Sequence, residues 1–225
     1  MKLVALMPMK ANSERVPGKN FKVLGTKPLF EHMLGTLVAL DAIDKVIINT
    51  DAPDMFLEYE LVRHEKVLVR ERPVEIVGNY VSMNEVIADD IRNVDADTYI
   101  MTHATNPFLS GDTIKQCLKK YYEGTCSGEH DSLFTASKIQ ARLYWDDGRA
   151  VNHDPDVLLP TQHLVPFFEE NSLLYIFSAG SFRSMNARVG KRPLIFETER
   201  LESIDIDTPE DWSLAAAVAR GLSEE

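Results

Sequence analysis

The sequence contains few cysteines, and it lacks both a long hydrophobic run and a secretory signal. Its 225 residues include only Cys117 and Cys126. Without a second cysteine pair these residues do not make a zinc site, and a disulfide is not expected between them. Because no stretch is apolar enough to span a bilayer or direct export, we expect a protein of the reducing cytoplasm.

Basic residues are also scarce relative to acidic ones. The chain has 24 Lys and Arg against 35 Asp and Glu, which gives a net charge of −11 at pH 7. Such a balance argues against nucleic acid and anionic membranes as partners, so any positive charge that serves function must be local. The Gly-x-x-x-x-Gly-Lys-Ser/Thr element of P-loop NTPases is absent as well.

Apolar runs alternate with amphipathic segments along most of the chain, which is 44% hydrophobic. This alternation predicts one α/β domain over residues 1–225, with a mainly parallel sheet flanked by helices. Right-handed crossovers would place the loops after the strands along one edge. We expect Asp51 to cap a helix that contains Phe56 and Tyr59. Strands are expected at residues 2–6, 45–49, 66–70, 98–102, 131–136, 173–177 and 192–197, and helices at 28–40, 51–61, 81–94, 110–121 and 179–185.

The alternation is interrupted at residues 141–170. Residues 143–151 have the pattern of two short strands around the turn Asp147-Gly148, and an apolar stretch at 165–168 follows. A hairpin this small cannot bury its own apolar face and packs on something else. A second subunit and the chain's own sheet are equal alternatives for that surface.

A polar loop follows the first predicted strand and concentrates positive charge. Lys10, Arg15 and Lys19 lie in it, in a chain that is acidic elsewhere. Ligands bind at the carboxyl ends of strands in open α/β sheets, so such a loop suits a polyphosphate. A solvated basic loop is an equally good interpretation of the loop alone.

Two carboxylates near the end of the chain form a second candidate site. In extended backbone, Asp205 and Asp207 share one face and Ile204 and Ile206 share the other. Paired carboxylates are hard oxygen ligands that suit Mg²⁺. Alternatively, Asp207 merely caps the helix that the residues Thr208-Pro209 introduce.

Together these stretches resemble the acylneuraminate cytidylyltransferase family over nearly the whole chain. The resemblance is strongest at residues 10–20, which look like the nucleotide loop of the family, and at 203–208, which match its C-terminal signature. Residues 49–51, 103–109 and 171–176 support it in the same order along the chain.

The resemblance implies a Rossmann-like nucleotidyltransferase fold and a homodimer whose protruding β-hairpin arm, residues 141–170, reaches the partner's site. It implies transfer of CMP from CTP to the anomeric hydroxyl of a sialic-acid-like sugar acid, with Mg²⁺ on Asp205 and Asp207 and with pyrophosphate release. The residues expected to act in catalysis are Lys10, Arg15, Lys19 and Asp207. Those expected to contact substrate, or in the case of Asn20 to brace the loop, are Asn12, Ser13, Asn20, Arg70, Arg72, Ser82, His103, Thr105, Asn106, Gln162 and Asn171.

The chain departs from the family pattern at three positions. Glu14 stands where members carry lysine, His103 replaces a glutamine that helps to hold the sugar acid, and Glu169 replaces an arginine. The last two changes leave the acceptor open among N-acetylneuraminic, pseudaminic and legionaminic acids. A nucleotide-sugar glycosyltransferase and a CTP-binding homologue without activity are the alternative functions.

Overall fold

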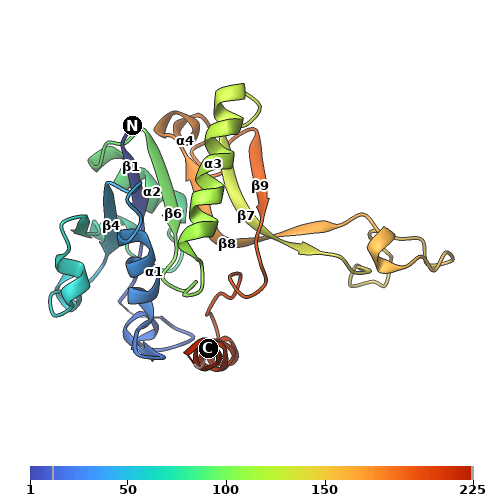
Figure 1. The fold of residues 1–225 in the computed structure, drawn as a ribbon, viewed down its shortest axis with the longest axis horizontal. Helices are drawn as coiled ribbons and strands as arrows, with labels where there is room; N and C mark the ends of the chain where they lie inside the picture. The colour runs from blue at the N-terminus through green and yellow to red at the C-terminus, as the bar shows by residue number, and fades with distance from the viewer. Residues whose placement is uncertain (12, 224–225) are drawn as a thin grey trace.

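A computed structural model describes residues 1–11 and 13–223 and contains a seven-stranded sheet of order β5-β4-β1-β6-β8-β7-β9 (Figure 1). Neighbouring strands are parallel except β8, which runs antiparallel to β6 and β7. The predicted mainly parallel sheet is therefore confirmed. The strands are β1 Leu3–Leu6, β4 Lys45–Thr50, β5 Val67–Glu71, β6 Thr98–Thr102, β7 Ser132–Ile139, β8 Phe167–Phe177 and β9 Pro193–Glu197, and β2 Val23–Leu24 pairs separately with β3 Lys27–Pro28.

Helices cover both faces of the sheet because side chains alternate along each strand. In β1, Leu3 and Ala5 join the core beneath α1 and α3, whereas Val4 and Leu6 join the core beneath α2 and α4. A third cluster packs α5 against Leu24. The α-helices are α1 Leu29–Val38, α2 Met83–Asn93, α3 Gly111–Ser127, α4 Ala179–Met185 and α5 Pro209–Ser223; the 3₁₀ turns are η1 Lys19–Phe21, η2 Pro53–Phe56, η3 Glu60–Arg63, η4 Val74–Ile76 and η5 Thr161–His163.

The structure shows where the two cysteines lie and how long the apolar helices are. Cys117 is buried and Cys126 is exposed, and both are free thiols. Within residues 1–11 and 13–223, no helix is long and apolar enough to cross a membrane.

The prediction of a helix at residues 51–61 is wrong. The chain forms only the short turns η2 and η3 there, and the backbone of Tyr59 between them is extended. The rings of Phe56 and Tyr59 both pack on Phe30, with centroids 5.3 and 5.0 Å away. The tertiary packing of these two aromatic rings outweighs the helical tendency that the spacing of apolar residues indicates. Asp51 is not a helix cap; its Oδ1 accepts a hydrogen bond from the Ala11 backbone N–H at 2.8 Å.

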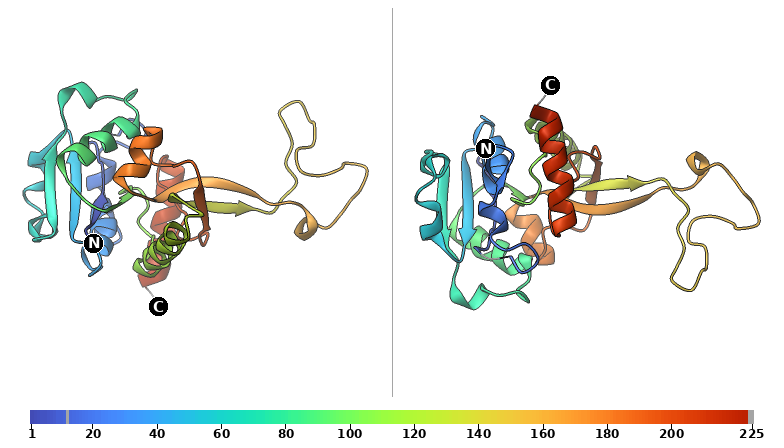
Figure 2. Two further views of the ribbon diagram at one scale, coloured as in Figure 1. Left: turned by 90° about the horizontal axis from the view of Figure 1, so that it is seen from above. Right: turned by 90° about the horizontal axis from the view of Figure 1, so that it is seen from below.

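Strands β7 and β8 extend beyond the sheet as a two-stranded ribbon, and the chain between them projects away from the body (Figures 1 and 2). The strand expected at 173–177 thus begins earlier, at Phe167. Residues 143–151 do not form two strands, because only the bridge between Tyr144 and Ala150 is present beside the turn at Gly148. The arm does not fold back over its own sheet, and it exposes large apolar side chains such as Leu158, which is 84% exposed.

Candidate active site

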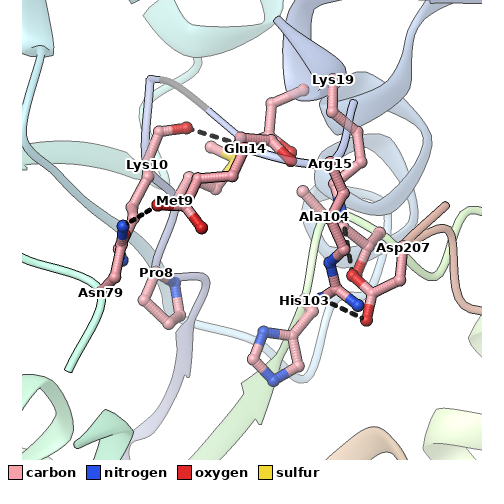
Figure 3. Close-up of a pocket in the computed structure, with 13 residues that line it drawn as sticks. Pro8, Met9, Lys10, Glu14, Arg15, Lys19, Asn79, His103, Ala104 and Asp207 are labelled. Carbon is pink, nitrogen blue, oxygen red and sulfur yellow. Dashed lines mark hydrogen bonds and ion pairs between the residues drawn. The ribbon is translucent and has the colours of Figure 1, made fainter. Parts of the chain in front are cut away.

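A cavity of about 300 Å³ lies where the loops after β1 and β6 meet the segment before α5 (Figure 3). The carboxyl ends of parallel strands point to this edge, as the topology of the sheet requires. Eight of the predicted site residues line it: Lys10, Ser13, Arg15, Lys19, Asn20, His103, Thr105 and Asp207. The cavity is completed by Pro8, Met9, Glu14, Asn79 and Ala104.

Asp207 is held by two of the three predicted cations. Arg15 Nη2 lies 3.0 Å from its Oδ2 and Lys19 Nζ lies 3.1 Å from its Oδ1. The Lys19 side chain is only 8% exposed, and its ammonium also donates to the Ile206 carbonyl. These contacts join the loop after β1 to the segment before α5. Lys19 and Ile206 are 187 residues apart in the sequence.

The remainder of the basic loop is braced against its neighbours. Asn20 donates to the Lys10 carbonyl at 2.8 Å, so it supports the loop from behind. Lys10 Nζ donates to the Gly78 carbonyl at 2.6 Å and to Asn79 Oδ1 at 3.0 Å. The Asn79 amide in turn donates to the Glu14 carboxylate. Figure 3 shows Lys10 and Asn79 across the cavity from Arg15, Asp207 and His103.

Asp205 and Asp207 are the two carboxylates predicted to hold Mg²⁺, and of these Asp207 lines the cavity whereas Asp205 does not. Within the described residues, Asp205 Oδ1 is buried without a hydrogen-bond partner. Burial raises the pKa of Asp205; the hydrogen bond from Thr105 opposes this, and the charge of Asp207 adds to it. No group of three or more His, Cys, Asp or Glu side chains in residues 1–11 and 13–223 could hold a metal. Mg²⁺ commonly uses one or two carboxylates with phosphates and water, so the donor set fits.

The cap of α5 is formed by Thr208 and Asp211, which removes the capping interpretation of Asp207. The Thr208 hydroxyl accepts from the Asp211 N–H at 3.2 Å, and Asp211 Oδ2 accepts from the Thr208 N–H at 2.7 Å. This reciprocal pair caps the helix in the manner of a capping box. The Asp207 side chain is not used as the cap, and its carboxylate lines the cavity, where Arg15 and Lys19 pair with it.

His103 supplies a neutral polar group to the cavity. Burial lowers the pKa of its imidazole to about 4, and the nearby Arg188 guanidinium lowers it further, against a smaller opposing effect of Asp207. The ring is therefore uncharged near pH 7. It can donate or accept a hydrogen bond there, as the amide in its place in the family would.

Arg70, Arg72 and Ser82, which were expected to contact substrate, do not line this cavity. Arg70 pairs with the carboxylates of Asp89 and Asp90. The buried Arg72 donates from Nε to the Asn49 side chain at 2.8 Å and from Nη2 to the Asn49 carbonyl at 2.9 Å. The Ser82 hydroxyl caps α2 by accepting from the Asn84 N–H. All three side chains thus have structural partners.

Three further predicted residues lie away from this cavity, and one cannot be placed. Asn106 is fully buried, and its side-chain amide has no hydrogen-bond partner within the described residues. Asn171 donates to hydroxyls of Ser137, Thr198 and Ser203, which ties β8 to the segment after β9. Gln162 lies in η5 on the arm. Asn12 falls outside the described residues.

A family model described as Cytidylyltransferase matches residues 4–221 of the chain. The chain belongs to the cytidylyltransferase family. A CMP-N,N'-diacetyllegionaminic acid synthase of Legionella pneumophila is 24% identical over 95% of this chain and 94% of its own. An N-acylneuraminate cytidylyltransferase of Streptococcus agalactiae is 22% identical over 94% of this chain, which spans only 52% of that longer relative.

The fold of this cytidylyltransferase-family chain is also found among solved structures. A CMP:2-keto-3-deoxy-manno-octonic acid synthetase, solved in complex with CTP, aligns over 99% of this chain and 100% of its own with a TM-score of 0.68. The sequence identity is 14%, so this comparison establishes the Rossmann-like fold. The predicted family and fold are confirmed.

Proposed function

We propose that the protein transfers CMP from CTP to the anomeric hydroxyl of a nonulosonic sugar acid and releases pyrophosphate, with Mg²⁺ as cofactor. One observation carries the proposal. The basic loop after β1 and the carboxylate segment before α5 meet in one cavity, with Arg15 and Lys19 on Asp207. Family membership and the full-length similarity to a legionaminic acid synthase support the class of donor and acceptor.

The cations of the basic loop would bind the triphosphate of CTP. The anomeric oxygen forms a bond to the α-phosphorus, the bond from that phosphorus to the β-phosphate oxygen breaks, and the hydroxyl proton is lost. Lys19, held in place by the Ile206 carbonyl, is positioned before substrate arrives. Preorganised positive charge stabilises the charge that develops on the departing pyrophosphate.

Asp205 and Asp207 would hold the metal. Mg²⁺ bound there would polarise phosphate oxygens and neutralise their charge. Arg15 and Lys19 balance the charge of Asp207. Phosphate oxygens compete for the same two cations, so CTP binding is expected to free the Asp207 carboxylate for coordination.

We also propose a homodimer built through the arm. The arm projects from the body and exposes Leu158 and Trp145, and apolar surface of this kind is typical of an interface between subunits (Figure 2). In such a dimer Gln162 would act in the site of the partner rather than in its own. A second chain would thus complete the acceptor side of each cavity.

Pyrophosphate release tests the function directly. CTP, UTP, ATP and GTP are each supplied with Mg²⁺ and with N-acetylneuraminate, legionaminate, pseudaminate or 3-deoxy-octulosonate. Release with CTP and one acid is the expected result. A glycosyltransferase would instead consume a nucleotide sugar without releasing pyrophosphate. Tight CTP binding with no turnover on any acceptor would favour the inactive homologue.

A further inference from the structure

A partly buried arginine near the cavity has few hydrogen-bond acceptors for its guanidinium group. Arg188 lies between α4 and β9, and its side chain is only 19% exposed. Its Nη2 is 3.5 Å from Glu170 Oε1, and its Nη1 is 3.9 Å from the Met101 sulfur. A guanidinium has five N–H donors and a thioether is a weak acceptor, so most of its hydrogen-bonding capacity is unused within the described chain. Burial of a weakly paired cation is costly, which indicates an anionic ligand.

One contact and one electrostatic effect place this guanidinium near His103 at the cavity. Met101, which Arg188 touches, precedes the cavity residue His103 by two positions at the end of β6. The charge of Arg188 also contributes to the low pKa of His103, after burial. The Arg188 backbone N–H donates to Asn84 Oδ1 at 3.3 Å, which fixes this part of the chain to the first turn of α2.

The face of the guanidinium is held by an aromatic ring. The Cζ atom lies 3.9 Å from the centroid of Tyr175, a cation–π contact that orients the plane of donors. The Tyr175 hydroxyl donates to the Glu170 carboxylate and lies 3.2 Å from Ser172 Oγ. Ser172 has a φ of +57°, a backbone conformation rare for a residue with a side chain. Such strain is concentrated at binding sites.

We infer that Arg188, stacked on Tyr175, binds the carboxylate of the sugar-acid acceptor. The identity of this ligand rests on the proposed function. A carboxylate matches the planar fork of a guanidinium with two parallel hydrogen bonds. The cations of the basic loop would bind the phosphates. The Glu170 carboxylate contacts both Arg188 and the Tyr175 hydroxyl. When the substrate carboxylate binds Arg188, Glu170 keeps its hydrogen bond with Tyr175.

Steady-state kinetics of Arg188→Met and Arg188→Lys test this inference. Loss of a charged bidentate contact should raise the KM for the acceptor by about 10- to 100-fold and leave the KM for CTP unchanged. The lysine variant should fall between, since it keeps the charge without the fork. Arg183→Met, an exposed change on α4, is the matched control and should resemble the wild type. Melting temperatures establish that each variant is folded.

The primary amide of the same acceptor separates binding from structural support. The wild type should use the amide poorly, and Arg188→Met should lose nothing further on it. Equal losses on acid and amide would mean that Arg188 only supports the fold, and a raised KM for CTP would mean that it binds a phosphate. Either result overturns the inference.

Calorimetry separates failure of this inference from failure of the proposed function. Each acid of the panel is titrated into the wild type and into Arg188→Met in the presence of CTP and Ca²⁺. Binding that only the wild type shows upholds the inference even without turnover. Equal binding by both proteins refutes the inference alone, whereas binding by neither refutes the proposed acceptor class and the inference with it.

Discussion

Asp207→Asn should remove turnover while leaving the fold almost untouched. The side chain is 41% exposed, and its partner Arg15 is 63% exposed, so solvent screens this pair. Screened ion pairs contribute about 0 to 1 kcal/mol to stability. Lys19 keeps its hydrogen bond to the Ile206 carbonyl in the variant. A lost metal ligand removes several kcal/mol of transition-state stabilisation, so kcat should fall by about two to three orders of magnitude.

A neighbouring carboxylate provides the matched control. Asp211 accepts from the Thr208 N–H and hydroxyl but lies outside the cavity lining. Asp211→Asn should lower the free energy of unfolding by about 1 kcal/mol through the helix cap and leave kcat close to the wild type. Pyrophosphate release and urea unfolding of both variants form the assay. Near-normal turnover of Asp207→Asn at saturating Mg²⁺ would refute the role assigned to Asp207.

Three other outcomes are expected. Lys19→Met should weaken CTP binding at least about tenfold in calorimetry, because a charge-assisted contact is lost, and unchanged affinity would reject the triphosphate role. Burial raises the pKa of Asp90 from 3.8 to about 6, so its contribution to stability is present at low pH and lost as pH rises through 6. As the pH rises from 3.8 to about 6, Asp90→Asn should therefore gain stability relative to the wild type in urea unfolding; a constant difference over this range would contradict this. Trp145→Asp on the arm should convert a dimer to a monomer in sedimentation, whereas an unchanged sedimentation coefficient would place the interface elsewhere.

The sheet could be predicted because its signal is local. The runs that became β1, β4 and β6 are apolar on both faces, as strands covered by helices on two sides must be. Right-handed connections between parallel strands predict that the loops after β1 and β6 lie at one edge of the sheet. In the structure, Lys19 and His103 line a common cavity at that edge. The carboxylate Asp207 was found for the same reason, since alternation around the buried Ile206 is also local.

The misplaced elements depend on partners that are distant in the chain. The apolar residues of segment 51–61 have helical spacing, but Phe56 and Tyr59 pack on Phe30 and the segment does not form a helix. Arg72 reads as a free cation at a strand end, whereas the structure buries it against Asn49 of the neighbouring strand. Neither partner can be identified from the residues that flank these positions.

The same reasoning explains why the proposed nucleotide side of the site could be predicted from the sequence and the proposed acceptor side could not. Arg188 follows Asn186, whose left-handed backbone ends α4, so the local pattern indicates only a polar turn. Its surroundings come from Tyr175 on β8 and Met101 on β6, which the antiparallel pairing of these strands makes adjacent. A loop that binds phosphate needs clustered charge within one segment, but selection among sugar acids depends on such cross-strand contacts. Substitutions at Arg188 should therefore change the choice of acceptor before they change the use of CTP.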